Sequence, residues 1–186
     1  MKILLSALLL IVAPLTAFAS DREPGQNSII GVWKVVEIAT DYGSAPDIGP
    51  KTSQVEPNLH PLPSQIIFTN SHYSMIWMPG KEAMTAFAIR WQPTDEEKLR
   101  RFGEIVMNTG TYELRDNLLT VHPRLARVPE FMGGRMVYDC KWSGDHLILT
   151  LIDEYTFDGV KAPWAGESSG HIHLILARLD DRRKQG

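Results

Sequence analysis

Three side chains of the sequence are candidates for acid–base chemistry or for polar contacts to a ligand: His122, Tyr112 and Glu37. His122 ends a run in which Leu118, Thr120 and His122 alternate along one face of an expected strand. If that face is interior, the imidazole shares the interior with the phenol of Tyr112. A neutral imidazole can hydrogen-bond a polar ligand, and near neutral pH it can act as a general base. The alternative is a histidine whose hydrogen bonds are satisfied within the core.

Glu37 belongs to a second expected strand, in which Trp33, Val35 and Glu37 alternate on one face. A carboxylate that faces an interior needs a partner, which Arg90 or a ligand would supply. We therefore expect Glu37 to reach the interior and contact a ligand there.

His171 and His173 are two residues apart on an expected strand, so both point to the same face. With a third ligand such as His122 or a carboxylate they would bind a metal ion. The simpler interpretation places both on a solvated outer face, and we predict no metal site.

Cys140 is the only cysteine, so the chain cannot form an intramolecular disulfide. Because Tyr138 and Trp142 flank it on one strand face, we expect a buried, inert thiol. A disulfide-linked dimer stays open, and the sequence does not fix the oligomeric state.

Common catalytic and nucleotide-binding signatures are missing from the sequence. It contains no glycine-rich phosphate loop, no G-x-S-x-G turn and no H-E-x-x-H zinc motif. The formal net charge is −3, and the longest basic cluster is the run Arg182-Arg183-Lys184. Nucleic acid is therefore not an expected partner, since phosphate binding needs a concentrated positive surface. We predict no cofactor, and the missing motifs favour a non-enzymatic function.

The first residues have the pattern of a secretory signal peptide: a cation at Lys2, an apolar run, and small residues ending at Ala19. An N-terminal membrane anchor is the alternative, but the apolar run is short and Pro14 interrupts it. We predict a signal peptide over 1–19, export to a periplasm or outside the cell, and no membrane span after cleavage.

The rest of the sequence is expected to form one domain over 30–180, between a flexible segment at 20–29 and a charged tail at 181–186. Runs rich in β-branched and aromatic residues, separated by turn residues, predict most of its strands. They cover 31–39, two strands within 64–78, hairpins over 110–122 and 135–152, and 172–179, while 83–91 tolerates a further strand.

One short helix is expected to begin after Thr94, because Glu97 three residues later completes a capping box, and to end at Gly103. It would act as a lid or plug, or as a mere connector. About eight antiparallel strands with one helix are typical of a closed barrel or a sandwich. We predict an all-β antiparallel barrel.

Two segments of the sequence carry a family resemblance. Gly31-Val32-Trp33 resembles the G-x-W signature of lipocalins, and the run from Gly110 to His122 resembles a segment of the small bacterial lipocalin-like domain family. The resemblance implies a calycin-type barrel whose first strand begins at Gly31. It also implies that Arg178 stacks on Trp33 at the closed end, in a structural role.

Two long connections, 41–63 and 156–170, are expected to line the open mouth of such a barrel, where binding residues collect. Tyr155 and Trp164 would contact a ligand there, or only pack locally. The expected function is binding of a small lipophilic molecule in the barrel interior. The alternative is an isomerase, cyclase or hydratase that uses acid–base residues of the same interior.

Overall fold

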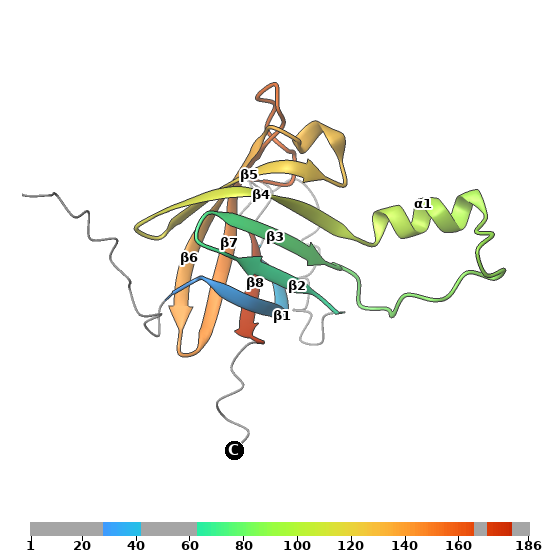
Figure 1. Ribbon diagram of the computed structural model, residues 1–186, viewed down its shortest axis with the longest axis horizontal. Helices are drawn as coiled ribbons and strands as arrows, with labels where there is room; N and C mark the ends of the chain where they lie inside the picture. The colour runs from blue at the N-terminus through green and yellow to red at the C-terminus, as the bar shows by residue number, and fades with distance from the viewer. Residues whose placement is uncertain (1–27, 42–62, 166–170, 180–186) are drawn as a thin grey trace, which may run out of the picture.

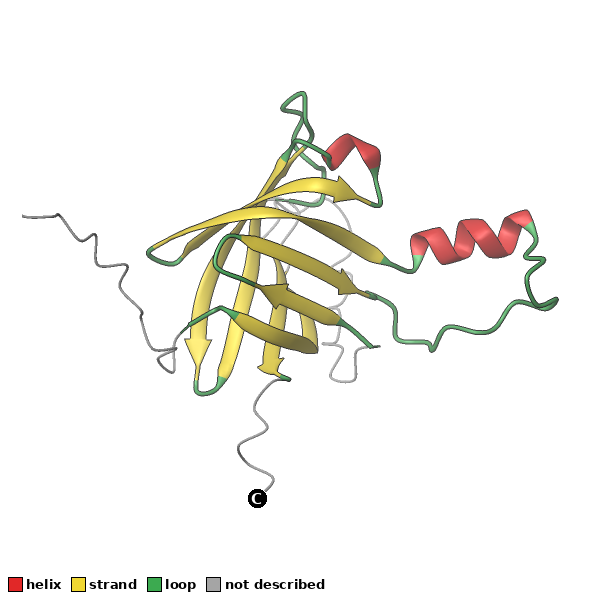
Figure 2. Ribbon diagram, viewed as in Figure 1, coloured by secondary structure: helices red, strands yellow, loops and turns green. Residues whose placement is uncertain are grey.

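The computed structural model describes residues 28–41, 63–165 and 171–179, and in these ranges the chain forms a closed antiparallel β-barrel (Figures 1 and 2). Each strand pairs with the next, and the last pairs with the first. The eight strands are β1 (Gly31–Asp41), β2 (Gln65–Phe68), β3 (His72–Trp77), β4 (Val106–Arg115), β5 (Leu118–Ala126), β6 (Arg135–Ser143), β7 (His146–Tyr155) and β8 (His171–Arg178). The predicted all-β barrel with one short helix is confirmed.

Several expectations fall on other parts of the chain. The signal peptide over 1–19, the tail over 181–186 and nearly all of the 41–63 connection lie outside the described residues. No helix of the described residues has the length and the apolar character that a membrane span requires.

The barrel interior is lined by alternate residues of the strands, as the two-residue period of a strand requires, except where a bulge shifts the alternation. In β5, for example, Leu119, Val121 and Pro123 are buried while Leu118 is exposed. The buried interior residues are mostly apolar, and they form one core cluster that draws on seven of the strands, while β4 packs against it through the partly buried Val106 and Tyr112. Burial of this apolar surface is the main driving force for closure of the barrel.

Trp33 occupies the end of the barrel at which β1 begins and β8 ends, and it is fully buried. Its indole N–H donates to the carbonyl of Ile29 at 2.8 Å, and the ring of Trp142 lies 5.9 Å away. The guanidinium of Arg178 stacks on the indole, 4.3 Å from the ring centroid, and donates to the carbonyl of Ile30 at 2.9 Å. Gly31 has a φ of 142°, a conformation that favours glycine where the chain enters this end.

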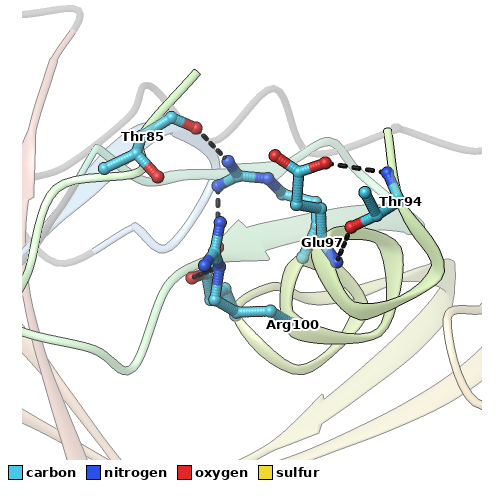
Figure 3. Close-up of polar contacts among 6 residues, drawn as sticks. Thr85, Thr94, Glu97 and Arg100 are labelled. Carbon is cyan, nitrogen blue, oxygen red and sulfur yellow. Dashed lines mark hydrogen bonds and ion pairs between the residues drawn. The ribbon is translucent and has the colours of Figure 1, made fainter. Parts of the chain in front are cut away.

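The one α-helix of the described ranges, α1 (Asp95–Gly103), follows a connection from β3. This connection forms no strand, so the further strand tolerated over 83–91 is not present. The capping box is formed: the backbone N–H of Glu97 donates to the Thr94 hydroxyl, and the Glu97 carboxylate accepts from the Thr94 N–H (Figure 3). No residue of α1 is buried, and the helix extends away from the barrel wall (Figure 1). It does not plug the interior.

Candidate functional site

Four buried side chains with polar atoms lie in the apolar interior of the barrel, and we call them the polar centre: Tyr73 of β3, Asn108 of β4, Tyr138 of β6 and Glu154 of β7. Their exposed fractions are 2%, 3%, 6% and 7%. Among the described residues, Asn108 is the only buried residue with a side-chain amide, and Glu154 is the only buried residue with a charged side chain. Buried polar groups of this kind need hydrogen-bond partners.

The thioether of Met136 joins two members of the polar centre. The amide nitrogen of Asn108 donates to the Met136 sulfur at 3.9 Å, and the Tyr138 hydroxyl donates to the same sulfur at 3.6 Å. A thioether is a weak acceptor. These two hydrogen bonds therefore only partly offset the free-energy cost of removing the two donors from water.

Two atoms of the polar centre have no hydrogen-bond partner among the described residues: the hydroxyl of Tyr73 and the side-chain oxygen Oδ1 of Asn108. A buried polar group left in this state costs about 1–3 kcal/mol. Tyr73 pairs with Gly110 across β3 and β4, while Asn108 pairs with Met75. The two side chains are thus diagonal neighbours on the interior face.

Glu154 is the charged member of the polar centre, and Trp164 is its partner. The indole N–H of Trp164 donates to the Glu154 carboxylate at 2.6 Å. Burial raises the pKa of the Glu154 carboxyl, and this hydrogen bond partly opposes the rise. Burial also raises the pKa of the Tyr73 and Tyr138 hydroxyls, and the charge of Glu154 raises them further. The three groups therefore interact electrostatically within the interior.

Two connections pack together at the end of the barrel opposite Trp33, at the top of Figure 1. One contains the short 3-10 helix η1 (Pro129–Phe131), and the other contains residues 156–165. The ring of Phe131 meets that of Trp164 edge to face, with centroids 6.0 Å apart. Ala162 and Ala165 are buried, and the Ala162 N–H donates to the Glu154 carbonyl at 2.8 Å. These contacts fold the second connection back over Glu154.

His122 lies on the outer face of β5, because the buried residues of that strand are its neighbours Val121 and Pro123. Tyr112 instead packs on the interior side near the β2–β3 turn. Its ring meets Phe68 edge to face at 5.3 Å, and its hydroxyl donates to the Thr69 carbonyl at 2.5 Å. The interior position expected for His122 is wrong, and the structure does not bring His122 and Tyr112 together.

Glu37 also lies on the outer face, which corrects the interior position expected for it. A β-bulge interrupts the pairing of β1 with β8: Val35 pairs with Leu176, but Glu37 pairs with Ile175. The bulge inserts one residue and reverses the alternation beyond it. Ile38 packs against the core in place of Glu37. The proposed partner Arg90 is exposed in the connection after β3.

Of the two aromatic residues expected at the mouth, Trp164 contacts the polar centre through Glu154 and Tyr155 does not. Tyr155 pairs with Arg135 at the edge of the β6–β7 ladder, and the Arg135 guanidinium lies 4.1 Å from the centre of its ring. Trp164 is 49% exposed, so it lies between the interior and solvent.

His171 and His173 lie on the outer face of β8, with ring centroids 6.5 Å apart, and Nδ1 of His173 is 2.9 Å from the Thr150 hydroxyl. Within the described ranges, no group of three potential metal ligands comes together. Cys140 is buried, and burial raises the pKa of its thiol to about 12, which keeps it protonated.

The four residues of the polar centre were not among those predicted from the sequence. Tyr73 shares a buried face with Met75, and Asn108 is two residues before Gly110, so strand alternation would have placed both inside. Alternation fails for Glu154. The buried series Leu147, Leu149 and Leu151 would continue to residue 153, but a bulge opposite Val137 and Tyr138 shifts the interior position to Glu154.

The raised pKa of Glu154 predicts a pH-dependent stability. A carboxyl whose pKa is higher in the folded protein than in the unfolded chain stabilises the fold fully below its ordinary pKa, and that contribution is lost as the pH rises through the raised pKa. We expect the free energy of unfolding of Glu154→Gln, relative to wild type, to increase as the pH rises above about 4.5. Urea denaturation across this range measures the difference.

The control for this experiment is Glu37→Gln, which removes one carboxylate from the outer face. The free energy of unfolding of Glu154→Gln is compared with that of wild type at each pH, and the effect of the control is subtracted. If no difference remains at any pH, the assignment of the pH dependence to Glu154 is contradicted.

A family model described as a lipocalin-like domain matches residues 30–178. Neither the curated proteins nor the solved structures contain a significant match.

Proposed function

The chain belongs to the lipocalin-like domain family, and from this premise we propose that it binds a small lipophilic molecule in the barrel interior. The observation that carries the proposal is the polar centre within an otherwise apolar interior. Small-molecule sites in proteins combine mostly apolar walls with a few convergent polar groups. Tyr73, Asn108 and Glu154 supply such groups.

The apolar walls and the polar centre of the interior would contribute differently to binding. Apolar ligand surface removed from water contributes about 25 cal/mol per Å² to the free energy of binding. The polar atoms contribute orientation, because each would gain the partner that it otherwise lacks. Trp164 lies between the interior and solvent, so it is the residue whose environment a ligand would change most.

We also propose that the protein acts after export, with residues 1–19 removed. Support comes from the tripartite pattern of these residues. A single buried thiol is consistent with an oxidising compartment, since it offers no accessible partner for disulfide exchange.

The acid–base alternative gives His122, Tyr112 or Glu37 a role in the barrel interior. His122 and Glu37 lie on the outer face, and Tyr112 is fixed by its contact with Thr69. Two of the three candidate residues therefore do not face the interior, which supports binding as the function that we propose.

Native mass spectrometry of the protein purified from its own source tests the proposal. We expect a non-covalent adduct that is present under native conditions and absent after denaturation, which is the control for covalent modification. Tryptophan fluorescence should change when that ligand is removed, since Trp164 contacts the polar centre. Empty protein with no fluorescence response to fatty acids, retinoids or isoprenoids would overturn the proposal.

A further inference from the structure

We infer that the bound molecule carries an uncharged head group that both donates and accepts a hydrogen bond, such as a hydroxyl or a primary amide, and that the interior disfavours a carboxylate. This inference rests on the proposed function and specifies the chemistry of the same site. It follows from the positions of Tyr73, Asn108 and Glu154, taken together with the absence of a buried cation in the described residues.

The two unpartnered atoms have opposite requirements. The Tyr73 hydroxyl has a proton to donate, and Oδ1 of Asn108 can only accept. Diagonal neighbours on one face of an antiparallel pair lie about 7–8 Å apart at the backbone, a span that long side chains cover. A hydroxyl or amide between them would accept from Tyr73 and donate to Asn108, which satisfies both atoms with one group.

Glu154 sets the charge preference. The Tyr73 and Tyr138 hydroxyls and the Trp164 indole interact with its carboxyl, and none of them carries a positive charge. Arg135 lies outside the barrel wall on the ring of Tyr155. Two carboxyl groups in one buried site cannot both ionise readily. A ligand carboxylate would therefore have to compete with Glu154 for a single proton.

A cationic head group fits the polar centre less well than an uncharged one. An ammonium has donors only, so it leaves the Tyr73 hydroxyl proton without an acceptor. Its pairing with Glu154 would also bury two ions, and the loss of their hydration offsets much of the attraction. An alcohol or amide avoids both penalties.

A matched series of ligands tests the inference: decanol, decanamide, decylamine and decanoate, each titrated into the folded protein near pH 7 with tryptophan fluorescence as the readout. We expect the alcohol and the amide to bind at least about tenfold more tightly than the amine and the acid. Binding of decanoate or decylamine as tightly as decanol would overturn the head-group inference and leave the proposed function intact. Failure of all four to bind would overturn the proposed function.

Substitution of Glu154 tests the origin of the charge preference. Glu154→Gln keeps an acceptor for the Trp164 indole and removes the charge. It should strengthen decanoate binding, measured relative to decanol binding in the same variant, about tenfold. Glu37→Gln on the outer face is the control and should change neither. Unchanged decanoate binding in Glu154→Gln would overturn the role given to Glu154.

Substitution of Tyr73 separates a binding role from a structural one. Tyr73→Phe removes a hydroxyl that has no partner in the described residues, so the unliganded protein should unfold at the same temperature as wild type or above it. The same change should weaken decanol binding about tenfold. Tyr155→Phe, outside the interior, is the control. A lower unfolding temperature with unchanged affinity would overturn the role given to Tyr73.

Discussion

Replacement of Trp33 with alanine is expected to lower the free energy of unfolding by about 3–5 kcal/mol, the largest effect of any single substitution that we consider. The indole is fully buried, and its N–H bond to Ile29 and its contact with Trp142 are lost with the ring. The guanidinium of Arg178 would then lie over an empty space in place of an aromatic face. Urea denaturation followed by circular dichroism measures the change.

Trp91→Ala is the matched control, because it makes the same chemical change at a side chain that is 88% exposed. It should change stability by less than about 0.5 kcal/mol. Equal denaturation midpoints for Trp33→Ala and wild type would show that Trp33 does not hold the closed end of the barrel together.

Substitution of Gly110 with alanine is expected to have the second largest effect, a loss of about 1–3 kcal/mol or more. A Cβ atom at this position would lie 2.0 Å from the backbone oxygen of His122 and 2.9 Å from the backbone nitrogen of Arg124. Both are backbone atoms of β5, so no side-chain rotation can relieve the clash. The β4–β5 ladder would have to separate at the register shift next to Thr109. Thermal unfolding measures the loss.

Gly103→Ala serves as the control, since a Cβ atom there has no neighbour within 4 Å. Its stability should equal or slightly exceed that of wild type, because alanine is the better helix former. An unfolding temperature for Gly110→Ala equal to that of Gly103→Ala would contradict the close approach of β5 to β4.

The barrel could be predicted because its signals are local. Turn residues such as Asp116, with a φ of 56°, and Gly144, also with a φ of 56°, separate strands that hydrogen-bond to each other. The capping box at Thr94 depends on four consecutive residues. Strand order then follows from short connections, which favour pairing between neighbours in sequence.

The site could be predicted only in part, because bulges decide which residues face inward. The interior side of β1 continues from Val35 to Ile38 and leaves Glu37 outside, while the interior side of β7 continues from Leu151 to Glu154. Neither shift has a local sequence signal such as a glycine or proline. A two-residue period therefore assigns the wrong glutamate to the interior.

The polar centre is a property of the closed barrel and not of any one strand. Asn108 and Tyr138 meet at the Met136 sulfur although β5 separates their strands. Trp164 was predicted at the mouth, but its partner Glu154 was not, because the contact depends on how residues 156–165 fold back. The sequence predicts the connection but not the path that its residues take over the barrel end.

The ladder between β1 and β8 has a consequence for how the chain acquires its fold. Trp33 pairs with Arg178, so the first strand to be synthesised finds its second partner only when the last strand is available. Contacts of such large sequence separation slow folding. Until β8 arrives, one edge of β1 and the apolar face of an incomplete sheet are open to other chains. Nascent chains are therefore most prone to aggregate just before β8 docks. Substitutions in β8 should lower the yield of folded protein more than their effect on equilibrium stability implies.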